Sequence, residues 1–224
     1  MTILSYGQQR NNMIHGQIRI AGVSEPRLLE AFQAIPREDF MPDPYRHMAY
    51  MDKNLAIGEG RFFIAPANYA RLVQAINIQP DTRVLDIGCL SGYSTAILGS
   101  LSSHVCGVDD QKWIMVAKHV AESTGLAMQD FYIGALTDGA EERAPFDVII
   151  INGAIQYVPQ ILVDQLAEGG VIACFWRQGK RHAGQGTGQA VLHRKHGNLL
   201  HTQILFDASV PVLPGFEQEK GFVF

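Results

Sequence analysis

The chain has 224 residues, 18 basic and 22 acidic side chains, a formal net charge of −4 and 47% hydrophobic residues. This composition is typical of a globular protein and excludes collagen-like, strongly disordered and membrane-spanning chains. A protein that binds nucleic acid mainly through phosphates would carry a basic excess or stripe. The one basic cluster, at residues 177–182, is more simply a solvated loop. We therefore expect neither a nucleic-acid nor a membrane partner.

The three cysteines, Cys89, Cys106 and Cys174, lie far apart and form no paired motif. A sparse, odd set of cysteines indicates a reducing compartment rather than a disulfide framework. Polar residues interrupt the first twenty positions before a signal-peptide core develops, and no apolar run reaches the ~20 residues of a spanning helix. We expect a cytoplasmic protein that is not exported.

The first third of the chain predicts helices. Ile14, Ile18 and Ala21 share one helical face, and a second helix begins with Ser24 as its N-cap and ends at Pro36. An irregular, proline-containing connector follows. A third helix is expected over residues 67–78, where the apolar residues again share one face.

From residue 83 the pattern alternates between short apolar runs and helical stretches. Such strands, apolar without alternation, are buried on both faces of a sheet, and strand–helix repetition predicts parallel strands with right-handed crossovers. Two alternating segments near the end predict an antiparallel pair, and a Gly-rich stretch before them predicts a surface loop. The expected strands are 84–87, 105–108, 131–133, 147–151 and 171–176, the helices 94–101, 114–120 and 158–166, the antiparallel pair 190–193 with 199–206, and the loop 179–188.

We therefore expect a single α/β domain over residues 1–224. Residues 1–80 form a helical N-terminal extension and substrate-side segment, residues 81–176 a parallel cofactor-binding core, and residues 177–224 the antiparallel C-terminal strands.

The clearest functional motif follows the strand that ends near Asp86. A turn holds Gly88 and Gly92, a helix opens directly afterwards, and the next strand ends at Asp109. Open α/β sheets hold nucleoside ligands at such a turn, and a carboxylate at the end of the second strand can accept both ribose hydroxyls. The alternative is a plain tight turn, with Asp109 capping the next helix.

The details of the turn separate the possible ligands. A dinucleotide fingerprint starting at Gly88 would need glycine where the chain has Leu90 and Tyr93. The looser glycine pattern of S-adenosylmethionine enzymes keeps two of its three glycines, so S-adenosylmethionine fits better than NAD. A serine-hydrolase elbow around Ser91 fails because Cys89 replaces a required glycine.

Several further blocks of the sequence, in order and at a characteristic spacing, accompany the glycine turn: residues 36–40, 49–52, 55–60, 83–98, 104–109, 144–150 and 165–170. In these blocks the chain resembles the protein-L-isoaspartate O-methyltransferases. The resemblance implies a Rossmann-like seven-stranded S-adenosylmethionine-dependent methyltransferase fold, and methyl transfer to the free carboxylate of an isoaspartyl residue. A carboxylate is already ionised at neutral pH, so such catalysis is mainly alignment of the two reactants.

The chain departs from the family at three places. Phe62 and Ile64 stand where the family has a threonine and its substrate-aligning serine, so no catalytic residue is assigned. Leu90 replaces the middle glycine of the turn, and its side chain must turn away or occupy space near the methionine end of the cofactor. Ala135 replaces a carboxylate that would bind the adenine amino group.

The expected site residues follow from the motif and the resemblance. Asn152, which ends the fourth strand, is expected at the mouth of the substrate site. No metal site is expected, because His193, His196 and His201 are more simply solvated hairpin residues. The cofactor-binding residues are Asp86, Gly88, Cys89, Gly92, Tyr93, Asp109, Ala135 and Leu136, and the substrate-side residues are Phe62, Phe63, Ile64, Pro66 and Asn152.

The leading hypothesis is a methyltransferase that uses S-adenosyl-L-methionine and acts on a protein, peptide or small-molecule carboxylate, isoaspartyl groups among them, with reduced or altered activity. The alternative is a catalytically inactive methyltransferase-like protein with a binding or regulatory role. An NAD-linked dehydrogenase is disfavoured by the glycine pattern, and the oligomeric state stays open.

Overall fold

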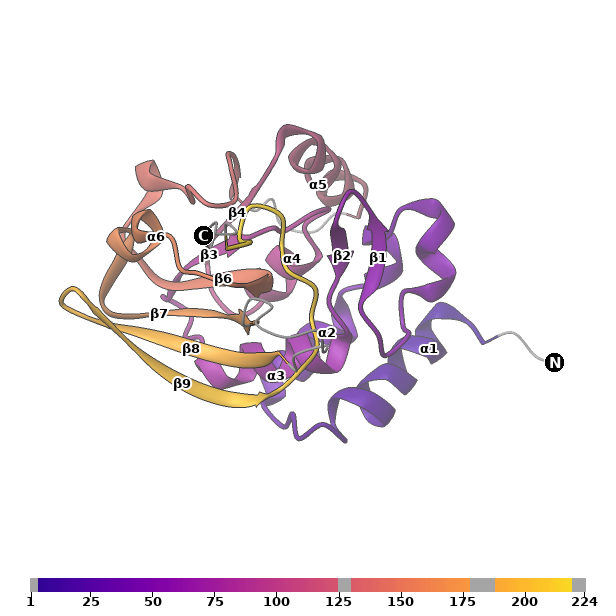
Figure 1. Ribbon diagram of the computed structural model, residues 1–224. Coiled ribbons are helices and arrows are strands. Elements are labelled where there is room, and N and C mark those ends of the chain that lie inside the picture. Colours follow the sequence, from indigo (N-terminus) through magenta and orange to yellow (C-terminus); the bar gives the residue numbers. More distant parts are fainter. Residues whose placement is uncertain (1–3, 125–129, 178–187, 219–224) are drawn as a thin grey trace, which may run out of the picture.

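The computed structural model describes residues 4–124, 130–177 and 188–218 (Figure 1). The helices are α1 (Tyr6–Met13), α2 (Pro26–Ala34), α3 (Pro66–Ile76), α4 (Tyr93–Gly99), α5 (Gln111–Thr124) and α6 (Gln160–Asp164), with a π-helical segment over Ile14–Ile18 and 3-10 turns over Arg37–Phe40, Asp43–Met48 and Glu141–Arg143. The strands are β1 (Leu55–Gly58), β2 (Arg61–Phe63), β3 (Arg83–Ile87), β4 (His104–Asp109), β5 (Asp130–Ile133), β6 (Phe146–Ile155), β7 (Leu166–Trp176), β8 (Gln189–His196) and β9 (Leu199–Asp207).

Seven of these strands form one sheet in the order β5-β4-β3-β6-β7-β8-β9. In this order the first five strands, from β5 to β7, run parallel. Strands β8 and β9 extend the sheet beyond β7, and each runs antiparallel to its neighbour. The chain moves outward from β3 to β4 and β5, and then returns to the other side of β3 with β6. The carboxyl ends of β3, β4 and β6 therefore lie at a topological switch point, where open α/β sheets bind ligands.

Neighbouring residues of the central strands point into two separate cores. Val84 packs in a core with the N-terminal helices, α3 and α4. Leu85 and Ile87 pack on the opposite face, in a core that includes Leu213 and Phe216 from the end of the chain. Because the strands are covered on both faces, they carry the continuous apolar runs seen in the sequence. The predicted seven-stranded Rossmann-like fold is confirmed.

The structure differs from the sequence expectations at several boundaries. The first helix begins at Tyr6, where Ser5 and Gln8 form a capping box, and it shows no apolar stripe that would predict it. The N-cap of α2 is Glu25 rather than Ser24. Strand β7 begins at Leu166 instead of 171, and the loop expected over 179–188 lies almost wholly outside the described residues.

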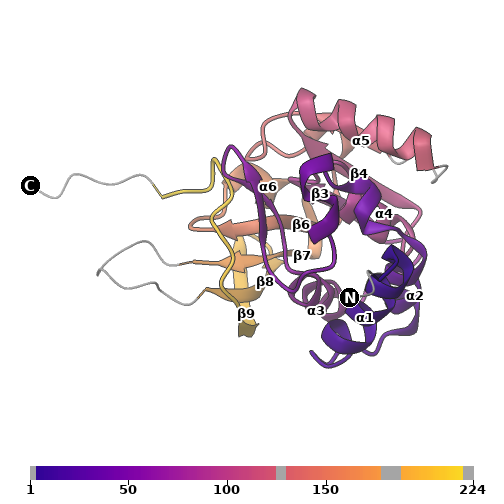
Figure 2. The same ribbon diagram turned by 90° about the vertical axis from the view of Figure 1, so that its right-hand side faces the viewer.

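The β1–β2 hairpin is the element that the sequence did not predict. It lies beside the carboxyl ends of β3 and β4 (Figure 1), and an ion pair between Glu59 and Lys112 joins its turn to the start of α5. The C-terminal segment, residues 208–216, leaves β9 and crosses the same edge of the sheet (Figures 1 and 2). Both elements therefore cover the place where a ligand of this fold binds.

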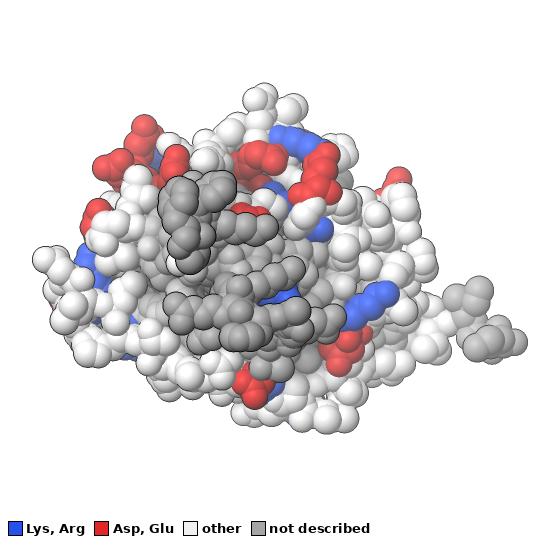
Figure 3. All heavy atoms as spheres, in the orientation of Figure 1, with Lys and Arg blue, Asp and Glu red and all other residues white. Residues whose placement is uncertain are grey.

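Two observations concern membrane spans and the charge of one face of the molecule. No helix in the described ranges is both long and apolar enough to cross a membrane. On the face shown in Figure 3, Lys and Arg side chains lie interspersed with Asp and Glu side chains.

Candidate functional site

The turn between β3 and α4 has the backbone that a glycine-rich ligand turn requires. Gly88, Leu90 and Gly92 all have positive φ, at 77°, 53° and 88°. Leucine rarely adopts this conformation, because its Cβ crowds the following carbonyl. Leu90 is only 4% exposed, so a buried side chain and a left-handed backbone coincide at the position where the resemblance implies glycine.

Asp86 joins three elements beneath this turn. Its carboxylate is fully buried and accepts hydrogen bonds from Ser94 Oγ at 2.6 Å, Thr95 Oγ1 at 2.7 Å and Asn152 Nδ2 at 2.6 Å. Burial raises the pKa of Asp86 to about 6, although the three hydrogen bonds act to lower it. Asn152, expected at the substrate mouth, donates its amide to Asp86 and also lines the small cavity beside the turn.

Asp109, the expected ribose-binding carboxylate, is paired within the protein. Arg61 Nη1 donates to Oδ1 at 2.7 Å, and Arg61 Nη2 donates to Oδ2 at 2.6 Å. The backbone N–H groups of Leu90 and Asp110 donate to the same two oxygens. The capping alternative for Asp109 is wrong, because Asp110 Oδ1 accepts from the N–H of Trp113 in the first turn of α5.

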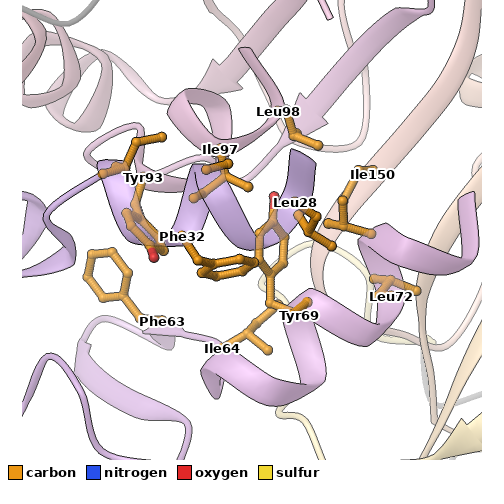
Figure 4. Close-up of a cluster of buried hydrophobic side chains, with 14 of the residues drawn as sticks. Leu28, Phe32, Phe63, Ile64, Tyr69, Leu72, Tyr93, Ile97, Leu98 and Ile150 are labelled. Carbon is orange, nitrogen blue, oxygen red and sulfur yellow. The ribbon is translucent and has the colours of Figure 1, made fainter. Parts of the chain in front are cut away.

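A small cavity lies beside the turn, on its substrate side. It has a volume of about 30 Å³, which is room for one or two water molecules. Figure 4 shows Phe63 beside Tyr93, and Ile64 against Tyr69. Pro66 is buried as the first residue of α3. The residues that line the cavity are Arg37, Phe62, Phe63, Ile64, Tyr69, Gly88, Cys89, Leu90, Tyr93, Ser94 and Asn152.

Arg37 is the functional candidate that residue-by-residue reasoning missed. Its guanidinium is 3% exposed and donates to the carbonyl oxygens of Ala49 and Ile64, each at 2.9 Å. It also lies over the Tyr93 ring, 4.8 Å from the centroid. Among the described residues no carboxylate pairs with it, and the Tyr93 hydroxyl has no hydrogen-bond partner. The signal was present, because Arg37 belongs to the block at residues 36–40 that carried the family resemblance.

The remaining expected cofactor residues surround the same edge of the sheet. Cys89 is buried, and burial raises the pKa of its thiol well above the usual range. A Cβ added at Gly92 would lie 3.1 Å from Phe131, so this glycine permits close packing of α4. Ala135 and Leu136 follow β5, directly after Gly134, whose N–H donates to the carbonyl of Asp109. They do not line the cavity.

The histidines differ from the expectation in one respect. His193 is not solvated: it is 5% exposed, shares a hydrogen bond with Thr202 and packs edge-on against Trp176. Burial lowers its pKa. His196 and His201 are exposed on the hairpin, as expected.

This sheet order, with a glycine turn after its central strand and a carboxylate ending the next, defines a Rossmann-like fold of the class that binds nucleoside cofactors. The family model described as protein-L-isoaspartate(D-aspartate) O-methyltransferase (PCMT) matches residues 8–183, and the chain belongs to this family.

Curated relatives and solved structures agree with this assignment. A protein-L-isoaspartate O-methyltransferase of Pectobacterium atrosepticum is 38% identical over 165 residues, 73% of this chain and 79% of the relative. One from Serratia proteamaculans is 38% identical over 157 residues, 70% and 76% of the two chains. A solved protein-L-isoaspartate O-methyltransferase matches with a TM-score of 0.75 at 24% identity, covering 92% of this chain and 66% of that one. A Plasmodium falciparum PCMT structure, in complex with S-adenosyl-L-homocysteine, matches with a TM-score of 0.73 at 19% identity, covering 94% and 99%.

These comparisons support S-adenosylmethionine as the cofactor, as predicted. Two side chains of the described residues, however, lie against the glycine turn itself. A Cβ added at Gly88 would lie 3.2 Å from Leu213 Cδ2 and 3.7 Å from Arg61 Nη2. The protein's own residues thus fill the space against the turn.

Proposed function

We propose that the chain is an S-adenosylmethionine-dependent methyltransferase of the PCMT type that acts on a carboxylate in the cytoplasm, with an isoaspartyl residue of a protein or peptide as the first substrate to test. The cofactor supplies an activated methyl group when bound. A carboxylate acceptor is ionised at neutral pH and needs no general base, so the chain has to bind, orient and desolvate it.

The observation that supports a carboxylate acceptor is the buried cation in the cavity. Arg37 has five N–H donors, and the described residues accept from two of its donor nitrogens. Its planar guanidinium suits a carboxylate, and the Tyr93 hydroxyl offers a further donor in the same cavity. We infer that these two groups orient the acceptor.

The apolar residues of the cavity act differently. Phe62, Phe63 and Ile64 are each about 5% exposed or less and line the same space as Arg37. They exclude water from the acceptor, which strengthens its electrostatic interaction with the guanidinium. Ile64 cannot donate a hydrogen bond, and the loss of one positioned donor typically costs on the order of 10²- to 10³-fold in rate.

The test is transfer of a labelled methyl group to an isoaspartyl peptide, with the aspartyl form of the same peptide as the control acceptor. Slow methylation of the isoaspartyl peptide by the wild-type chain, raised on the order of 10²-fold or more in Ile64→Ser, would support the proposal. Wild-type activity that Ile64→Ser does not raise would show that another residue replaces the serine.

The second candidate is a methyltransferase-like protein without catalysis. The observation that favours it is the pairing of Asp109 with Arg61, together with Ile64 at the serine position. Absence of labelled product from both the wild-type chain and Ile64→Ser, with folded protein in each case, would select this candidate.

A further inference from the structure

We propose that Arg61 and the C-terminal segment, residues 208–216, form an internal plug of the donor site, so that a nucleoside cofactor binds only when Arg61 and Leu213 are displaced. The inference rests on the proposed function, since it takes the edge around Gly88 and Asp109 as the cofactor site.

The first argument is the state of the Asp109 carboxylate. A carboxylate offers about four acceptor positions, and four N–H groups already occupy them, two from Arg61 and one each from the backbones of Leu90 and Asp110. Asp109 is 0% exposed. A ribose hydroxyl can bind this carboxylate only if the Arg61 guanidinium leaves it.

The second argument is the position of Leu213. Its side chain is 1% exposed and lies between Gly88, which directly follows β3, and Gly153, which lies near the end of the neighbouring strand β6. A Cβ added at Gly88 would be 3.2 Å from Leu213 Cδ2, and one added at Gly153 would be 2.7 Å from Leu213 Cβ. Glycines at such places normally let a ligand approach the backbone. In this chain the Leu213 side chain, rather than a ligand, lies against both glycines.

The third argument is that the segment is firmly held. The backbone of Ala154 donates to the carbonyl of Pro211 and accepts from the N–H of Leu213, both at 2.9 Å. Beyond Leu213, Phe216 is fully buried, and its carbonyl accepts from the N–H of Gln156. The segment therefore adds a short parallel bridge beside β6 and is not a loose tail.

The consequence is that the protein itself occupies the space against the glycine turn and the acceptor positions of Asp109. The cavity of about 30 Å³ that remains beside the turn lies on its substrate side. Binding must then include displacement of the plug, and its cost weakens the apparent affinity for the cofactor.

Calorimetric titration with S-adenosylhomocysteine tests the plug without requiring activity. Three single variants are compared with the wild-type chain, and the folded state of each is checked by circular dichroism. Leu213→Ala removes the side chain over Gly88, and Arg61→Gln frees part of Asp109. Leu72→Ala is the matched control, because Leu72 is equally buried in α3 and belongs to the other core.

The plug predicts that Leu213→Ala and Arg61→Gln each bind S-adenosylhomocysteine at least tenfold more tightly than the wild-type chain, and that Leu72→Ala does not. Equal, tight binding by the wild-type chain and Leu213→Ala would overturn the plug and leave the proposed function intact. Absence of binding in every folded variant would overturn both.

Discussion

The guanidinium of Arg61 and the carboxylate of Asp109 form a two-pronged ion pair, at 2.7 and 2.6 Å, between strand β2 and the end of β4. Both side chains are almost completely buried. The pair joins the β1–β2 hairpin to the parallel sheet and neutralises the acidic residue on which nucleoside binding would depend. The same ion pair therefore stabilises the packing of the hairpin on the sheet and blocks the access of a nucleoside to Asp109.

Breaking this pair is expected to be costly. Removing one partner of a buried ion pair leaves an uncompensated charge, which typically costs about 3–5 kcal/mol. We expect Arg61→Gln and Asp109→Asn each to lower the free energy of unfolding by roughly this amount, as measured by urea denaturation. The double variant should lose at least about 1 kcal/mol less than the sum of the single losses, because the pair is coupled. Additive losses would show that the two side chains stabilise the fold independently.

The contact between Gly88 and Leu213 can be isolated by a pair of glycine substitutions. Gly88 and Gly169 have nearly the same positive φ, 77° and 76°, but an added Cβ meets Leu213 only at Gly88 and meets nothing within 4 Å at Gly169. In both Gly→Ala variants the left-handed backbone should lower the free energy of unfolding by roughly 1–2 kcal/mol.

The Gly88→Ala variant should lose about 1 kcal/mol more than Gly169→Ala, because its Cβ overpacks against Leu213. Thermal and urea unfolding measure both losses. In a Leu213→Ala background the two substitutions should cost the same amount. If the excess at Gly88 persisted there, Leu213 would not be its cause.

The raised pKa of Asp86 should make the free energy of unfolding depend on pH. Burial raises its pKa to about 6, above the value of about 3.9 for an unfolded chain, so the native state favours the protonated carboxyl. The stabilising contribution is present below about pH 4 and is lost as the pH rises through 6. At about 1.4 kcal/mol per pKa unit the loss is roughly 3 kcal/mol.

The variant Asp86→Asn removes this titration, and the hydroxyls of Ser94 and Thr95 can rotate to accept from the new amide. Urea unfolding from pH 4 to 8 should therefore show the wild-type chain losing roughly 2 kcal/mol relative to Asp86→Asn between pH 4 and pH 7, and the difference should stay constant above pH 7. A difference that does not change between pH 4 and 7 would mean that Asp86 is not protonated in this range.

Arg37 should be sensitive to the shape of its head group. One ammonium cannot reproduce the planar fork that reaches the carbonyls of Ala49 and Ile64. We expect Arg37→Lys to raise KM for the methyl acceptor at least tenfold while changing the affinity for S-adenosylhomocysteine much less. Arg71→Lys is the control, because Arg71 stacks on Phe206 away from the cavity. Equal effects of the two substitutions on KM would assign Arg37 a purely structural role.

The sequence predicts the sheet well, because its central strands are buried on both faces and therefore apolar throughout. The turn at Gly88 and Gly92 could also be predicted, since glycine alone accepts left-handed backbone without cost. The first helix could not be predicted, because it shows almost no apolar stripe and its boundary depends on the Ser5 cap. The β1–β2 hairpin is too short for alternation to show.

The plug could not be predicted from the sequence for a different reason. Arg61 lies 48 positions from Asp109 and Leu213 lies 125 positions from Gly88, so their contacts depend on the full topology. A local sequence pattern predicts whether a side chain is buried, but it does not predict which distant residue that side chain contacts. Asn152 shows the same limit: its place near the carboxyl end of the fourth parallel strand was predictable, although β6 continues to Ile155, and its hydrogen bond to Asp86 was not.

The central claim is that the cofactor and the C-terminal segment compete for one site, and amide hydrogen exchange of residues 208–216 tests it most directly. The N–H of Leu213 donates to the carbonyl of Ala154, and that of Phe216 to the carbonyl of Leu213. The account predicts that saturating S-adenosylhomocysteine accelerates exchange at these two amides while it slows exchange at the turn around Gly88. Slower or unchanged exchange at Leu213 and Phe216, with the ligand bound, would contradict it.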